Sequence, residues 1–355
     1  MKKALLLVLG ITVLFCGTTL AQNLIDFEDM FIDVLADGTY QANTPFFPGV
    51  LIQTIYNSTG AFKSWPVVVR AHDNPDVEGD CGVEVPDYLG TVPAFSSNLC
   101  SKTNSTNNYP VRSGYNSLSD TSEGIPPAPV GPRKQDGFLI IFDYPVKDFS
   151  LWIVDWGDFF PPGSGEHTWP SYVELIANDN GGVIVDTDKT PDLNEATGNR
   201  DATQSPNGII KLEIESGGIR EVEVRFKGFI DPGVTIDDIE FTGELHIDIK
   251  PGSYPNCFNS NGNGVIPVAI LGSEEFDVTI INPFSVKLDG QPVRVKGKSG
   301  KAGSYEDVND DGFVDLIVQM EDEDVYSPED TIGTISAYSY EGVYFTGQDS
   351  ICITQ

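Results

Sequence analysis

Positive charge is scarce in this sequence. Among 355 residues, 21 are lysine or arginine and 53 are aspartate or glutamate, so the formal net charge at pH 7 is −32. Nucleic-acid phosphates are bound by clustered lysine and arginine, so the deficit excludes a nucleic-acid partner and argues against an anionic membrane surface. The surplus carboxylates either keep the chain soluble by self-repulsion or are partly neutralised by bound cations.

Histidine is rare as well, and familiar catalytic motifs are missing. His72, His167 and His246 are the only histidines, and none has the H-E-x-x-H spacing of a zinc site. No P-loop and no G-x-S-x-G nucleophile elbow is present. We therefore expect a non-enzymatic protein. The enzymatic alternative is a glycoside hydrolase, because such an enzyme needs only two carboxylates and no longer sequence motif.

Long apolar runs are absent except at the N-terminus. Lys2 and Lys3 precede the apolar stretch 4–15, and small residues up to Ala21 complete the order of a secretory signal. We predict a signal peptide at residues 1–21, no membrane span, and a secreted, extracellular protein. Without the two lysines the net charge falls from −32 to −34. The C-terminus shows no anchoring helix, which favours release from the cell.

Cysteine is sparse, but its number suits an oxidising compartment. Cys16 lies in the signal sequence, and four cysteines remain after it. Four cysteines permit three pairings. We favour the disulfides Cys81 with Cys100 and Cys257 with Cys352, because each pair then lies inside one expected domain. On the chain-entropy model the short loop contributes about 3 kcal/mol and the long one about 4 to 5.

No segment shows a convincing helical period, whereas short strand patterns recur along the chain. Gly, Pro, Asn and Asp punctuate it about every ten residues, and β-branched or aromatic runs stand between them. Several runs alternate apolar and polar residues. The expected strands include residues 67–69, 138–142, 149–154, 172–176, 183–185, 209–214, 222–226 and 236–241. This pattern predicts an all-β protein with two tandem β-sandwich or jelly-roll-like domains.

A fresh strand pattern opens after residue 244, and the chain length allows two domains. We therefore place the first domain at residues 22–244 and the second at residues 245–355. The stretch 96–132 is rich in Ser, Asn, Thr, Gly and Pro. We expect it to form a long surface insertion in the first domain.

The strongest local signal is the pattern D-x-N-x-D-G-x-x-D at residues 307–315. Calcium takes about six to eight oxygen ligands, and alternate positions of a tight turn bring side-chain oxygens to one point. The predicted calcium ligands are Asp307, Asn309, Asp311, the carbonyl of Phe313, and Asp315. Position twelve is Val318 instead of the glutamate of an EF-hand. The loop resembles the strand-loop-strand calcium loops of integrin-α-type FG-GAP repeats, and we expect a structural role. The alternative is a polar turn without metal.

Aromatic residues gather in one segment of the first domain. Trp156, Phe159, Phe160 and Trp169 lie in a Gly- and Pro-rich stretch beside several carboxylates. Sugar rings stack on exposed aromatic rings, so these four residues are candidate ligand-binding residues. Trp152 stands in the preceding strand pattern, and we expect it to belong to the core.

The second domain resembles an uncharacterised extracellular module of secreted bacterial and archaeal proteins. The resemblance rests on the segments IDIKPGS at 247–253, GVIPVAILG at 264–272, FDV at 276–278 and the loop at 307–315. It covers about 110 residues. It implies a β-sandwich and no established activity.

The first domain resembles the jelly rolls of secreted and surface-anchored bacterial proteins, which are similar in outline to carbohydrate-binding modules. The resemblance rests on DFE at 26–28, PGV at 48–50 and DDIEF at 237–241. In such jelly rolls the first and last strands lie side by side, and an acidic residue from each can share a structural calcium. The resemblance therefore implies a second calcium site formed by Glu28 with Asp237 or Asp238.

The signal peptide, the calcium loop and the two resemblances point in one direction. They predict a secreted, calcium-binding protein whose partner is a polysaccharide or another surface polymer. The alternative is a structural or adhesive component of an envelope or matrix that self-associates. No residue pattern separates these two hypotheses.

Overall fold

The computed structural model describes residues 22–25, 47–55, 62–64, 67–70, 116–119, 137–154, 172–190, 209–227, 235–259, 264–321 and 326–354. Regular structure in these segments is almost entirely β-strand. The exceptions are short 3-10 helices, namely η4 (Val278–Ile280), η5 (Pro283–Ser285) and η6 (Gly297–Ser299). The prediction of an all-β protein is confirmed. None of the helices in the described segments has the length and apolarity needed to cross a membrane.

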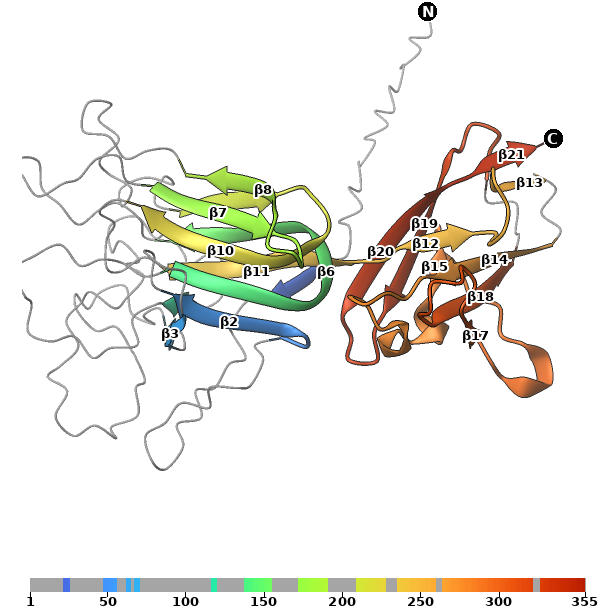
Figure 1. Cartoon of the computed structure of the whole chain (residues 1–355), viewed down its shortest axis with the longest axis horizontal. Coiled ribbons are helices and arrows are strands. Elements are labelled where there is room, and N and C mark those ends of the chain that lie inside the picture. Colours follow the sequence, from blue (N-terminus) through green and yellow to red (C-terminus); the bar gives the residue numbers. More distant parts are fainter. Residues whose placement is uncertain are drawn as a thin grey trace, which may run out of the picture.

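The strands of the N-terminal half form one layered body (Figure 1). They are β1 (Asn23–Ile25), β2 (Val50–Ile55), β3 (Phe62–Ser64), β4 (Val67–Arg70), β5 (Asn116–Ser119), β6 (Gly137–Val154), β7 (Tyr172–Asn178), β8 (Ile184–Lys189), β9 (Ile209–Ile214), β10 (Ile219–Lys227) and β11 (Thr235–Glu244). The first half of β6 pairs with β2 and β10, and its second half pairs with β9 and β11. β6 therefore belongs to both layers.

The core of this body lies between the two halves of β6. Alternate residues of each half are buried, among them Phe142 in the first half and Phe149 in the second. The Phe142 ring contacts Phe149 at 6.1 Å and Phe241 of β11 at 5.1 Å between ring centroids. The sequence predicts two separate strands here, at residues 138–142 and 149–154. The structure joins them into one strand.

Trp152 differs from its expected place. Its neighbours Leu151 and Ile153 are fully buried, whereas Trp152 is half-buried. Successive side chains of a strand point to opposite faces, so the inward positions belong to the two neighbours. The prediction that Trp152 belongs to the core is wrong.

β1 and β11 lie side by side, as expected for the first and last strands of a jelly roll. They pair antiparallel, with Ile25 opposite Ile239. This part of the prediction is confirmed. Asp238, on the same strand, has a left-handed backbone with φ of 43° and is buried.

The strands of the C-terminal half form a second body (Figure 1). They are β12 (Ile247–Ile249), β13 (Cys257–Asn259), β14 (Val265–Ile270), β15 (Lys287–Leu288), β16 (Gln291–Pro292), β17 (Gly303–Glu306), β18 (Asp315–Glu321), β19 (Ile332–Tyr338), β20 (Tyr344–Ser350) and β21 (Cys352–Thr354). One sheet has the order β12-β14-β18-β17, and β16-β15-β19-β20 continue the sheet of the first body. The predicted disulfide between Cys257 and Cys352 is present and links β13 to β21. Cys81 and Cys100 lie outside the described residues.

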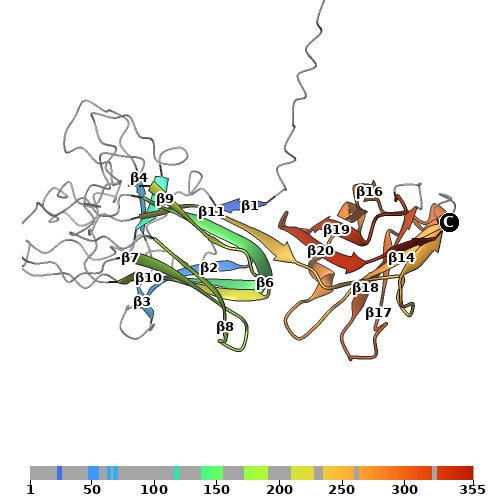
Figure 2. The ribbon, with the colours of Figure 1, turned by 90° about the horizontal axis from the view of Figure 1, so that it is seen from above.

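The two bodies meet where β11 ends, as the view from above shows (Figure 2). β11 pairs in parallel with β20, with Gly243 opposite Phe345. The Phe345 ring also contacts Tyr144 of β6 at 5.0 Å and Phe276 at 5.6 Å between centroids. Because this pairing ties both bodies into one sheet, the domain boundary at residue 244 stays a prediction.

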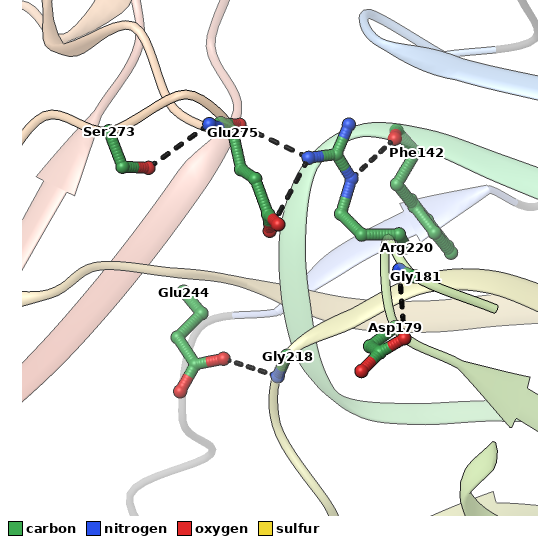
Figure 3. A network of polar contacts seen from close by, with 8 residues as sticks. All are labelled: Phe142, Asp179, Gly181, Gly218, Arg220, Glu244, Ser273 and Glu275. Carbon is green, nitrogen blue, oxygen red and sulfur yellow. Dashed lines mark hydrogen bonds and ion pairs between the residues drawn. The ribbon is translucent and has the colours of Figure 1, made fainter. Parts of the chain in front are cut away.

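Polar contacts reinforce the junction (Figure 3). The Nε of Arg220 donates to the carbonyl of Phe142 at 3.0 Å, and its Nη1 donates to the carbonyl of Glu275 at 3.2 Å. The Glu275 carboxylate lies 3.9 Å from the same guanidinium. The Glu244 carboxylate accepts a hydrogen bond from the amide of Gly218 at 2.6 Å. One arginine thus connects the first body to the loop that precedes Phe276 in the second.

Candidate functional site

The predicted calcium loop connects two paired strands. β17 and β18 are antiparallel, with Glu306 opposite Asp315, so residues 307–314 form the connection. Asp310 and Gly312 have left-handed backbones, with φ of 60° and 91°. These two reversals fold the loop back toward its own backbone. The expected strand-loop-strand form is confirmed.

Three predicted ligand side chains turn toward the same short stretch of backbone. The two Asp307 oxygens accept hydrogen bonds from the amides of Asp311 at 3.2 Å and Gly312 at 3.0 Å. Asn309 Oδ1 also accepts from the Asp311 amide at 3.2 Å. The Asp311 carboxylate accepts from the Phe313 amide at 2.8 Å and from Asn309 Nδ2 at 2.8 Å. The spacing read from the sequence therefore brings these oxygens together.

Asp315 occupies a different position from the other predicted ligands. Asp307, Asn309 and Asp311 are exposed, whereas Asp315 is completely buried. Its Oδ1 accepts from the amide of Gly272 at 2.9 Å, and its Oδ2 accepts from the amide of Val308 at 2.8 Å. In this structure Asp315 anchors the loop to the segment after β14. A role as a calcium ligand stays a prediction.

The loop supplies the kind of atom that calcium binds. Within the described segments, no three His, Cys, Asp or Glu side chains converge on a point that could hold a metal ion. The loop brings together two exposed carboxylates, Asp307 and Asp311, with the amide oxygen of Asn309. Calcium also binds amide and backbone carbonyl oxygens. These side-chain oxygens and the carbonyl of Phe313 therefore fit a calcium ion, whose positive charge is opposite to that of the two carboxylates.

The remaining predicted site residues are not brought together in the described structure. Asp237 lies on β11 opposite Trp152, and Asp238 follows it. Five residues lie outside the described segments, namely Glu28, Trp156, Phe159, Phe160 and Trp169. The second calcium site and the aromatic ligand platform therefore stay predictions.

A pocket in the C-terminal body was missed by sequence reasoning. It has a volume of about 440 Å³ and lies where β12, the end of β20 and the connection after β12 meet. The lining residues are Ile247, Asp248, Gly252, Ser253, Tyr254, Asn256, Asp349 and Ser350. Its first part coincides with the IDIKPGS segment, but nothing local in the sequence indicates that Asp349 lies beside it.

Hydrogen bonds fix one wall of this pocket. Asp349 Oδ2 accepts from the amide of Ile249 at 2.8 Å and from Asn256 Nδ2 at 2.9 Å. Asp349 Oδ1 accepts from the amide of Ser350 at 2.7 Å. Desolvation by burial, and secondarily the charge of Asp349, raise the pKa of the Asp248 carboxyl above its ordinary value of 3.8. The pocket is therefore rich in hydrogen-bond acceptors.

Comparisons with known proteins add no family. No protein-family model and no curated protein matches this sequence. Among solved structures, discoidin II from Dictyostelium discoideum is similar at 11% sequence identity over 54% of this chain and 71% of that chain. The TM-score is 0.19, a value too low to carry an argument about fold or function.

Proposed function

We propose that the protein is a secreted, extracellular, non-enzymatic calcium-binding protein that binds a carbohydrate polymer or another surface polymer. The observation that carries the calcium proposal is the loop between β17 and β18. Its exposed Asp307, Asn309 and Asp311 side chains accept hydrogen bonds from the backbone amides of residues 311–313, and the buried Asp315 holds the loop in place.

Calcium in this loop has a stabilising role. Asp307, Asn309, Asp311 and the carbonyl of Phe313 would hold the ion, which supplies positive charge beside two carboxylates. The ion relieves their repulsion and cross-links the turn, which favours the folded state by ligand linkage.

Exposed tyrosines support the binding of a polysaccharide. Tyr254 is 92% exposed, and Tyr340 is 66% exposed. Tyr305 and Tyr338 are also exposed, and all four belong to the C-terminal body. An aromatic ring next to polar groups can stack on the apolar face of a sugar while its neighbours bind the hydroxyl groups.

Two measurements on the protein without its signal sequence test the proposal. Calorimetric titration with CaCl₂ should show binding that is lost in Asp307→Ala. Sedimentation with insoluble cellulose, chitin, xylan and mannan should retain the protein on at least one of them, without release of reducing sugar. No calcium binding would remove the calcium proposal, and no retention on any polymer would remove the carbohydrate proposal. Release of reducing sugar would replace binding with hydrolysis.

A further inference from the structure

The pocket between β12 and the end of β20 combines three features in one place. It is concave, it contains two neighbouring carboxylates, and its lining includes Tyr254, whose side chain is 92% exposed. Its volume of about 440 Å³ lies in the range of small-molecule sites, about 300 to 1,000 Å³. The strands that frame it are labelled in Figure 1.

The acceptors of the pocket are not all satisfied by the protein. Asn256 is only 4% exposed, and its Nδ2 donates to Asp349 at 2.9 Å and to the carbonyl of Ser350 at 3.0 Å. Its Oδ1 has no hydrogen-bond donor, and it is the only buried side-chain polar atom of the described segments in this situation. Asn256 lines the pocket, and buried acceptors are nearly always paired, so its unpaired Oδ1 points to a donor supplied from outside.

Asp248 provides a second acceptor for a ligand. In the described part of the chain, no hydrogen bond or ion pair to the Asp248 side chain is present. The Asp349 carboxylate, in contrast, already accepts three N–H groups, which hold it and Asn256 in position. Asp248 is therefore the carboxylate that can accept hydrogen bonds from a ligand.

The different roles of Asp248 and Asp349 fit a binding site better than the active site of a glycosidase. A glycosidase requires two carboxyl groups that can act as acid and base or nucleophile. Asp349 is committed to backbone and amide donors, so Asp248 lacks a free catalytic partner. A bare cation would also leave most of the volume and the exposed Tyr254 ring unused.

We propose that this pocket binds one neutral sugar residue of an extracellular polysaccharide. Sugar hydroxyls donate hydrogen bonds to Asp248 and to Asn256 Oδ1, and the sugar ring stacks on Tyr254. The inference rests on the proposed carbohydrate function and assigns it a site. Asp349 is a positioning residue, because it acts on the ligand through Asn256.

NMR titration of the isotope-labelled protein tests this assignment. The probes are the methyl glycosides of glucose, galactose, mannose and N-acetylglucosamine, with CaCl₂ as a separate probe. At least one glycoside should shift the side-chain amide signals of Asn256 and the backbone signals of residues 248–254. Asp248→Asn and Tyr254→Ala should each weaken that binding by about tenfold, because each loses a charge-assisted hydrogen bond or the stacking surface.

Matched variants control for general effects. Glu215→Gln removes one exposed carboxylate in the first body, and Phe284→Ala removes an exposed ring elsewhere in the second. Both should bind the glycoside as the unaltered protein does, and the amide spectra should show that all variants are folded. Signals at the pocket that respond only to CaCl₂, or to no probe, would overturn the assignment.

The experiments distinguish failure of this site from failure of the proposed carbohydrate function. If the protein is retained on an insoluble polysaccharide and Asp248→Asn and Tyr254→Ala are retained equally well, this pocket is not the site, although the carbohydrate function stands. If no polymer retains the protein and no glycoside shifts a signal, both proposals fail.

Discussion

The carboxylate of Asp315 is completely buried, and both of its oxygens accept backbone hydrogen bonds. One comes from Val308 in the loop, and the other comes from Gly272 after β14. A Cβ on Gly272 would lie 2.2 Å from the carbonyl oxygen of Val314, so glycine permits the close approach of the two segments. At the residue scale, this contact fixes the loop whether or not metal is present.

Asp315→Asn should destabilise the protein by about 2 to 3 kcal/mol. The amide can accept only one of the two hydrogen bonds, and its NH₂ group then faces a backbone donor in a buried place. Urea unfolding measures the loss. Asp310→Asn is the matched control, because asparagine tolerates the left-handed backbone of that exposed position. An equal effect of both variants would contradict the anchoring role.

Asp248→Asn should raise the melting temperature at neutral pH. The folded-state pKa of Asp248 is raised above the ordinary value of 3.8, so its stability contribution is fully present below pH 3.8 and is lost as the pH rises through the folded-state pKa. The substitution removes this loss. The gain should therefore be present at neutral pH and vanish below pH 3.8, as thermal unfolding at both pH values can check. A gain that persists in acid would exclude the charge of Asp248 as its cause.

At the residue scale, the sequence predicts contacts between residues that lie close together in the chain. Asp307, Asn309 and Asp311 lie within five residues, so one turn brings them together. The partner of Asp315 lies 43 residues away at Gly272, and that distance has no local signal. The pocket is missed for the same reason, since Asp349 lies 100 residues after Ile249 in the sequence.

At the scale of elements, the disulfide between β13 and β21 closes a loop with a sequence separation of 95 residues. Replacing Cys257 and Cys352 together by serine should cost about 4 to 5 kcal/mol on the chain-entropy model. Guanidinium unfolding without reductant measures the loss against the unaltered protein. An unchanged midpoint would mean that the cross-link adds no stability.

The strand patterns predict individual elements better than their continuity. Alternation within residues 211–214 and 222–225 agrees with β9 and β10, because one face of each strand packs on the core. The same patterns at 138–142 and 149–154 conceal one strand of 18 residues, β6. Asp143, Pro145 and Asp148 between them are residue types typical of a turn in sequence. Only pairing with different neighbours on either side shows that β6 crosses between layers.

At the scale of the whole molecule, the junction depends on a glycine. A Cβ on Gly243 would lie 2.2 Å from Cδ1 of Phe345, which is fully buried. Gly243→Ala should therefore cost about 1 to 3 kcal/mol and loosen the contact between the bodies. Gly297→Ala is the control, since no atom lies within 4 Å of its added Cβ. Urea unfolding compares the two, and equal stability would show that the junction yields without cost.

The sequence could not predict this junction. It suggests two tandem units, but the parallel pairing of β11 with β20 joins Gly243 to Phe345 across most of the C-terminal half. Arg220 and Glu275 likewise meet from different bodies, and neither stands in a recognisable motif. Long-range pairing of this kind depends on the assembled core and is not encoded in local spacing.

Thermal unfolding of the protein with excess EDTA and with Ca²⁺, alongside Asp307→Ala and Asp311→Ala, tests whether the loop binds calcium. Ligand linkage predicts a calcium-dependent stabilisation of about 2.7 kcal/mol at a free calcium concentration of 100 times Kd. Both variants should lose this gain, and Asp310→Asn should keep it. An unaltered protein that melts at the same temperature in EDTA and in calcium would contradict calcium binding and leave the loop as a polar turn.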